Sequence, residues 1–184
     1  LHYHTWNVDD GGDAQTEWNG CFQGIMQCNV VIEDLDKLSP DQFGFSQDEF
    51  NNLKAQCRAL RAWFYIRLLD AFRHVPLAVS FNDISKNSEG QVEPKVIFDF
   101  IESELKESIE LLAQKGSLGG NGTMQGQWTK AGAAALLVRL YLNAEVYIGE
   151  EHYNDCATYA QKILDGEYGP YQIAETWDAP FDWN

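Results

Sequence analysis

The chain has 184 residues and a formal net charge of −15, from 28 acidic and 13 basic side chains. This length suits a single domain over residues 1–184 that buries one core without disulfides or metal ions. The acidic balance, with no cluster of Lys or Arg to offset it, excludes nucleic acid as a partner because a phosphate backbone is repelled. Neutral ligands, cations and other proteins remain as partner classes.

The four cysteines and the first residues of the chain indicate the state of the thiols and the origin of the chain. No two cysteines form a Cys-x-x-Cys pair, so we expect buried, unpaired thiols. The first residues, "LHYHTWNVDDGGDA", lack the basic and apolar regions of a signal peptide, and we interpret the chain as an excised piece of a longer protein. No run of eighteen apolar residues occurs, so the sequence predicts no transmembrane helix.

Two helices are predicted in the first half of the chain. Apolar residues recur at helical spacing from Trp18 to Leu38, until "SPDQFGF" breaks the pattern. Ser46 and Glu49 have the spacing of a capping box, in which each side chain satisfies a backbone donor of the other residue. The second helix is therefore expected to run from Ser46 to about Arg73, before a Val-Pro corner.

The second helix is apolar over most of its circumference, which predicts the central helix of an all-α stack. We expect Trp63, Phe64 and Leu68 in the core. A narrow polar stripe consists of Lys54, Arg58, Arg61 and Tyr65, and its arginines are predicted to lie along the exposed seam or to snorkel past their neighbours. In the first helix, Asn29 interrupts an apolar stripe and is predicted to be a hydrogen-bonded core amide.

Three more helices are expected over residues 94–112, 129–149 and 151–165, with a glycine-rich loop over 114–127. Helices one and two then form a hairpin, helices three and four form another, and the fifth opens a third. This order predicts an all-α fold in which tetratricopeptide-like helical hairpins stack in a right-handed array.

Five consecutive segments resemble one known family when they are taken in order. They are "WNGCFQGIMQCNVVIEDL", "AQCRALRAWFYIRLLDAFRHVPL", "EPKVIFDFIESELKESIELL", "TKAGAAALLVRLYLNAEVY" and "YNDCATYAQKILDGEYGPY". Together they resemble the SusD/RagB family, which are surface glycan-binding lipoproteins of Bacteroidetes. The similarity covers nearly the whole chain, although family members are much longer.

The resemblance implies a tetratricopeptide-like scaffold and non-enzymatic binding of an oligosaccharide, such as a starch-like glycan, at the bacterial cell surface. It implies delivery of the glycan to a SusC-like TonB-dependent transporter in the outer membrane, with a lipid anchor on residues outside this chain. The alternative is a generic tetratricopeptide-like scaffold for protein–protein interaction. An open groove lined by Asn and Arg would favour this alternative.

Sugar recognition needs a flat aromatic face and a few placed polar groups, and both ends of the chain offer them. The alternative for Trp6 is that it packs on the helices as an anchor. The alternative for Trp177 and Trp183 is that they are aromatic residues exposed at the end of a fragment. The candidate glycan-binding residues are Trp6, Asn7, Asp9 and Asp10 near the start, and Trp177 and Trp183, with Asp178 and Asp182, near the end.

The sequence predicts neither a metal site, a cofactor nor an enzyme. His2 and His4 lie close to Asp9, Asp10 and Asp13, but this acidic stretch lacks the alternating oxygen ligands of a calcium loop. No Ser or Cys nucleophile stands in a pattern with a His, and no paired carboxylates are placed for acid–base catalysis.

Overall fold

Helices make up nearly all the regular structure of the chain in the computed structural model, which describes residues 12–81, 90–114, 126–171 and 175–176. Within these ranges an isolated antiparallel bridge joins Val75 and Val92. The helices are α1 (Gly12–Leu35), the 3-10 helix η1 (Pro40–Phe43), α2 (Gln47–Phe72), α3 (Pro94–Leu111), α4 (Lys130–Leu142), α5 (Ala144–Ile148) and α6 (Tyr153–Leu164). The predicted all-α fold is confirmed.

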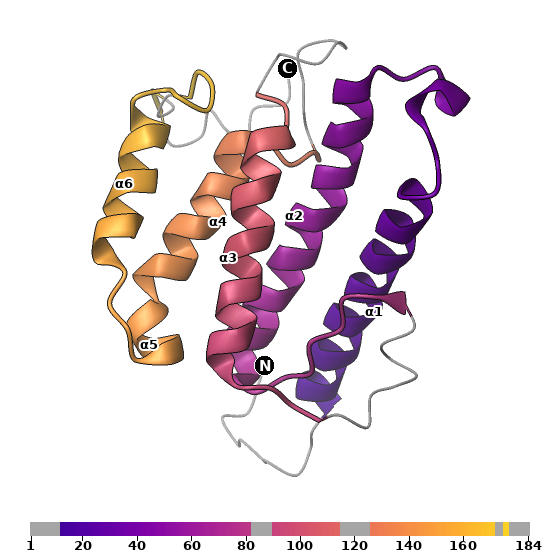
Figure 1. Ribbon diagram of the computed structural model, residues 1–184. Helices are drawn as coiled ribbons and strands as arrows, with labels where there is room; N and C mark the ends of the chain where they lie inside the picture. The colour runs from indigo at the N-terminus through magenta and orange to yellow at the C-terminus, as the bar shows by residue number, and fades with distance from the viewer. Residues whose placement is uncertain (1–11, 82–89, 115–125, 172–174, 177–184) are drawn as a thin grey trace.

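The long helices lie side by side in chain order (Figure 1). Helix α1 packs on α2, α2 on α3, α3 on α4 and α4 on α6, while the short α5 lies against α3 and α4. Successive long helices run in opposite directions, so α1 with α2 and α3 with α4 form the two predicted hairpins, and α6 follows as the start of a third. No helix of the described ranges is long and apolar enough to cross a membrane.

Local signals fix the ends of α2. Ser46 Oγ accepts from the backbone N–H of Glu49 at 3.3 Å, and Glu49 Oε2 accepts from the backbone N–H of Ser46 at 2.8 Å, which confirms the capping box. The helix ends at Phe72, because Arg73 adopts a φ of 62° that helical backbone excludes, and Pro76 follows.

Two predicted boundaries are wrong. Helix α1 begins at Gly12 rather than Trp18. The apolar periodicity does not indicate its first turns, because the residues there are exposed. The helix predicted over 129–149 is divided at Asn143, whose backbone leaves helical geometry (φ −102°, ψ 6°) and whose Nδ2 donates to the carbonyl of Arg139 at 2.8 Å. This side-chain bond offers the backbone an alternative to the next helical turn.

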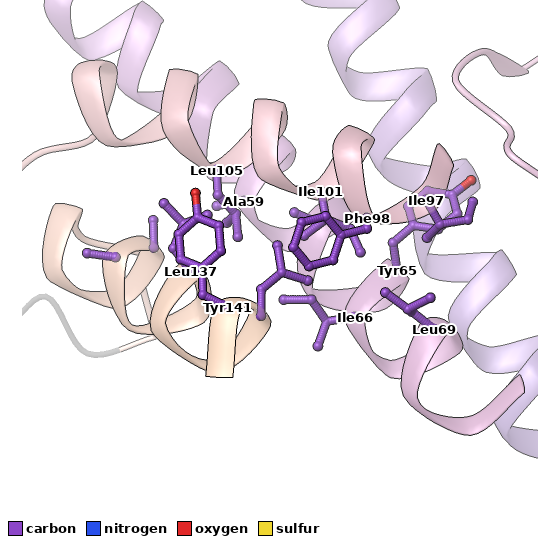
Figure 2. Close-up of a cluster of buried hydrophobic side chains, with 14 of the residues drawn as sticks. Ala59, Tyr65, Ile66, Leu69, Ile97, Phe98, Ile101, Leu105, Leu137 and Tyr141 are labelled. Carbon is purple, nitrogen blue, oxygen red and sulfur yellow. The ribbon is translucent and has the colours of Figure 1, made fainter. Parts of the chain in front are cut away.

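The core lies between α2, α3 and α4 (Figure 2), which confirms the central position of α2. Phe98 and Tyr141 face each other across it, with their ring centroids 6.3 Å apart. The residues that are drawn and labelled there are all buried, and they are Ala59, Tyr65, Ile66, Leu69, Ile97, Phe98, Ile101, Leu105, Leu137 and Tyr141.

The polar stripe of α2 does not lie wholly at an exposed seam, because two of its members, Arg61 and Tyr65, are buried. Tyr65 Oη accepts from the backbone N–H of Ala78 at 2.8 Å and donates to its carbonyl at 3.1 Å. Conversely, Trp63 and Phe64 are only half-buried. A helical wheel sorts residues by polarity, whereas burial of a polar side chain depends on partners from elements distant in sequence.

Candidate functional site

The residues predicted to bind glycan lie outside the described residues. They are Trp6, Asn7, Asp9 and Asp10 before α1, and Trp177 and Trp183 after α6. Their role stays a prediction.

A hollow of about 300 Å³ opens on α2 within the described part of the chain. This volume is at the lower end of the roughly 300–1,000 Å³ typical of small-molecule pockets. Helices α1, α2 and α4 all contribute to its wall. We call it the Trp63 hollow, and its lining residues are Glu17, Trp63, Arg67, Asp70, Ala71 and Arg139.

Helical spacing brings the α2 residues of the hollow together. Trp63, Arg67, Asp70 and Ala71 are separated by four, three and one positions, so they share one face of the helix. The residues of α2 that pack against α3 and α4, such as Ile66 and Leu69, lie between them in sequence and point into the core. The hollow therefore occupies the face of α2 that turns away from the core.

An ion pair fixes the first part of the wall. Arg67 Nε and Nη2 donate to the two carboxylate oxygens of Glu17 at 2.6 Å each, a bidentate arrangement. These hydrogen bonds hold the pKa of the Glu17 carboxyl below its usual value. The Arg67 guanidinium also lies 4.9 Å from the ring centroid of Trp63, and the cation–π contact orients both side chains.

Asp70 and Arg139 form the opposite edge of the Trp63 hollow, where the charged groups lie farther apart. Asp70 Oδ1 accepts from the hydroxyl of Tyr147 at 2.9 Å, and Asp70 Oδ2 lies 3.6 Å from Arg139 Nη2. Burial, together with this hydrogen bond, raises the pKa of Tyr147 to about 12, so its phenol stays a donor at neutral pH. The side chains of Asp70 and Arg139 are each 52% exposed.

This combination of groups can bind a polar ligand that has an apolar face. The indole offers an apolar wall, and the carboxylate and guanidinium beside it offer an acceptor and a donor for hydroxyl groups. Among the residues that the structure describes, no group of three His, Cys, Asp or Glu side chains is placed to hold a metal ion.

The hollow is not predicted from the sequence, because Trp63 is expected in the core. The available signal was the placement of Arg67 and Asp70 four and seven residues after Trp63, which puts charged side chains on the same helical face as the indole. The contributions of Glu17 and Arg139 depend on how α1 and α4 pack, and no local pattern announces them.

A second hollow, of about 520 Å³, is lined by residues at the start of α2, the end of α3 and the start of α4. Two of its polar side chains are engaged within the protein. Asn52 Oδ1 accepts from the backbone N–H of Ala113 at 2.9 Å, and Lys130 Nζ donates to the carbonyl of Glu110 at 3.0 Å. These groups tie α2, α3 and α4 together, so we assign this hollow a structural role.

A buried polar cluster joins α1, α2 and α3. Arg61 Nε donates to Glu104 Oε2 at 2.9 Å, and Arg58 Nε donates to Glu104 Oε1 at 2.9 Å. Arg61 Nη1 also donates to Asn29 Oδ1 at 2.7 Å, and Asn29 Nδ2 donates to the carbonyl of Ala78 at 3.1 Å. The prediction that Asn29 is a hydrogen-bonded core amide is confirmed, and the cluster positions the segment that follows α2.

The cysteines have the properties of structural thiols. All four are free, and Cys21 and Cys28 are buried. Burial raises the pKa of Cys21 to about 11, with a further contribution from its hydrogen bond to Glu17, and raises the pKa of Cys28 to about 12. Both thiols are therefore protonated at neutral pH and poor nucleophiles.

Stacked helical hairpins around an apolar core, with a small aromatic and charged hollow on one face, define the chain as an all-α scaffold of the repeat type. The model of the SusD-like family described as "Starch-binding associating with outer membrane" matches residues 1–142. The chain belongs to this SusD-like family.

Individual relatives agree with this assignment. The chain is 29% identical over 158 residues to the starch-binding protein SusD of Bacteroides thetaiotaomicron, which covers 84% of this chain and 26% of that protein. The fold matches a SusD homologue from the same species with a TM-score of 0.79 at 19% identity, over 96% of this chain and 33% of the other. A laminarin-binding SusD-like protein matches with a TM-score of 0.74 at 23% identity, over 90% and 34% of the two chains. The chain thus spans about a third or less of the length of these relatives.

Proposed function

We propose that the chain is one domain, over residues 1–184, of a longer protein that binds oligosaccharide without enzymatic activity at the bacterial cell surface. The match of residues 1–142 to a starch-binding, outer-membrane-associated family carries this proposal. Two similar proteins are named for starch and for laminarin, which are both neutral glucose polymers. The ligand class that we propose is therefore a neutral glucan fragment.

We further propose that the whole protein passes its glycan to a SusC-like TonB-dependent transporter and is held at the outer membrane by a lipid anchor on another part of the protein. The outer-membrane association of the family supports this proposal.

The proposed sugar contacts follow from side-chain chemistry. Trp6, Trp177 and Trp183 supply flat faces for the apolar side of a pyranose ring. Asn7, Asp9 and Asp10 supply acceptors, and Asn7 also a donor, for its hydroxyl groups.

Isothermal titration of the chain with malto-oligosaccharides and laminari-oligosaccharides tests the proposed function. We expect saturable heat with at least one of them. Trp6→Ala should weaken binding by roughly tenfold, the size of a typical hot-spot truncation, without lowering the melting temperature. Tyr153→Ala is the matched control, since this aromatic is exposed on α6 and is not one of the proposed contacts. Equal losses of stability and affinity in Trp6→Ala make that tryptophan a packing anchor instead.

A further inference from the structure

We propose that the Trp63 hollow binds one neutral hexose unit of the oligosaccharide and forms a subsite that recognises uncharged sugars. This inference rests on the proposed glycan-binding function and adds to it a second set of contacts, on α2 and α4, that are distinct from the residues near the chain ends.

The first support is a rigid aromatic wall. The Trp63 indole packs against Phe64, with ring centroids 5.0 Å apart at an interplanar angle of 64°, and against the Arg67 guanidinium. Glu17 in turn fixes Arg67 through two hydrogen bonds. A wall that is held from two sides loses little conformational entropy when a sugar ring packs against it.

The second support is a donor and an acceptor that the protein leaves available at the rim. The 3.6 Å separation between Arg139 Nη2 and Asp70 Oδ2 exceeds a normal hydrogen bond, so both groups keep capacity for a ligand. Two neighbouring sugar hydroxyls can donate to Asp70 Oδ2 and accept from the guanidinium of Arg139. Tyr147 holds the other oxygen of Asp70, which fixes the direction of the carboxylate.

The third support is the charge balance, which selects the class of sugar. Among the residues that the structure describes, two carboxylates and two guanidinium groups line the hollow, so their charges cancel. The chain as a whole carries −15, which repels acidic glycans at a distance. A neutral hexose meets hydrogen-bonding partners here without an electrostatic penalty, whereas a uronic acid competes with Asp70 and Glu17 for the same cations.

The test compares oligosaccharide affinity among four proteins by isothermal titration with maltohexaose and laminarihexaose. These are the wild type, Arg139→Ala, Asp70→Asn and the control Lys162→Ala. Loss of a hydrogen bond to a charged group should weaken binding about tenfold in Arg139→Ala. Asp70→Asn should bind severalfold more weakly, while its amide oxygen still accepts from Tyr147. Melting temperatures should stay close to that of the wild type, because both side chains are half-exposed.

Lys162→Ala removes the same charge from α6, where Lys162 makes a similarly loose contact of 3.9 Å with Glu167. We expect it to bind as the wild type does. A loss as large as that of Arg139→Ala would assign the effect to net charge and overturn the inference. Titration with oligogalacturonate completes the test, and tighter binding of this acidic ligand than of both neutral ones would overturn the proposed sugar class.

The remaining outcomes separate the two proposals. A wild type that binds a neutral oligosaccharide, with Arg139→Ala and Asp70→Asn binding equally well, overturns the subsite and leaves the proposed function in place. A cooperatively melting wild type that takes up none of the ligands overturns both for this chain.

Discussion

Arg61 and Arg67, six residues apart on helix α2, each pair with a glutamate, and these two pairs serve different purposes. The Arg61–Glu104 pair is buried, with 7% and 5% of the side chains exposed, whereas the Arg67–Glu17 pair is exposed by 41% and 33%. Both pairs join α2 to a neighbouring helix. The comparison shows that surroundings, rather than the pairing itself, decide whether such a pair holds the fold together or builds the wall of a site.

The buried pair belongs to a network in which each charge has several partners. Glu104 accepts from both Arg58 and Arg61, and Arg61 also donates to Asn29. These hydrogen bonds to the charged groups offset the large free-energy cost of removing two charges from water. The network fixes α1, α2 and α3 relative to one another, and Phe81, which donates its backbone N–H to Glu33 at 2.7 Å, is anchored to α1 beside it.

The exposed pair has a single carboxylate partner for its arginine and a tryptophan beneath the guanidinium. Exposure weakens its contribution to folding, since solvent-exposed pairs contribute about 0–1 kcal/mol. Its consequence is geometric, because it holds the indole of Trp63 and leaves the rim of the hollow open to a ligand.

The largest effect that we expect comes from breaking the buried pair. Glu104→Ala leaves Arg61 charged and without its carboxylate, and should lower the free energy of unfolding by about 3–5 kcal/mol in urea melts. Glu107→Ala is the control, because Glu107 also pairs with Arg58, at 2.7 Å, but is 56% exposed. It should cost about 1 kcal/mol or less. Similar losses in the two variants would contradict the distinction between buried and exposed pairs.

A smaller effect should come from the packing of α1 on α2 between the two pairs. A Cβ added to Gly24 lies 2.2 Å from the ring of Phe64, so Gly24→Ala forces that ring to move and should cost about 1–3 kcal/mol. Gly20→Ala, on the same helix with nothing within 4 Å, should instead stabilise the chain by about 0.4–1 kcal/mol. Melts of both variants check the opposite signs, and combining Gly24→Ala with Phe64→Leu should restore part of the loss.

The smallest effect concerns the exposed pair and is pH-dependent. The folded-state pKa of Glu17 lies below the usual 4.5, so its stabilisation is complete above that value and is lost as pH falls through the lower, folded-state pKa. The wild type should melt slightly higher than Glu17→Gln at pH 7, and the difference should vanish in strong acid. In an Arg67→Gln background the difference should shrink to the small part that the hydrogen bond from Cys21 to Glu17 supplies. A difference that persists there in full would assign the effect to another partner.

Much of the fold could be predicted because its signals are local. The capping box at Ser46 and Glu49, the Val-Pro corner and the apolar periodicity define α2 within the chain itself. Asn29 could also be predicted, since an amide within an apolar stripe needs a partner. The burial of Arg61 could not, because its partner Glu104 lies 43 residues away and belongs to another helix.

The Trp63 hollow shows the same limit more clearly. Trp63 and Arg67 are close in sequence, but Glu17 is 50 residues from Arg67, and Arg139 reaches the hollow from α4. Tryptophans near the chain ends can be noticed in the sequence because polar residues surround them there. An aromatic residue inside an apolar helix cannot be noticed in this way, although its exposure is decided by how the neighbouring helices pack.

The most direct test of the account is a crystal structure of the chain with bound maltohexaose or laminarihexaose. We predict one sugar ring packed against the indole of Trp63, with hydroxyls hydrogen-bonded to Asp70 and Arg139, and adjoining units in contact with Trp6. An oligosaccharide bound at saturation elsewhere on the surface, with the Trp63 hollow occupied by solvent alone, would contradict the assignment of α2 as both scaffold and binding wall.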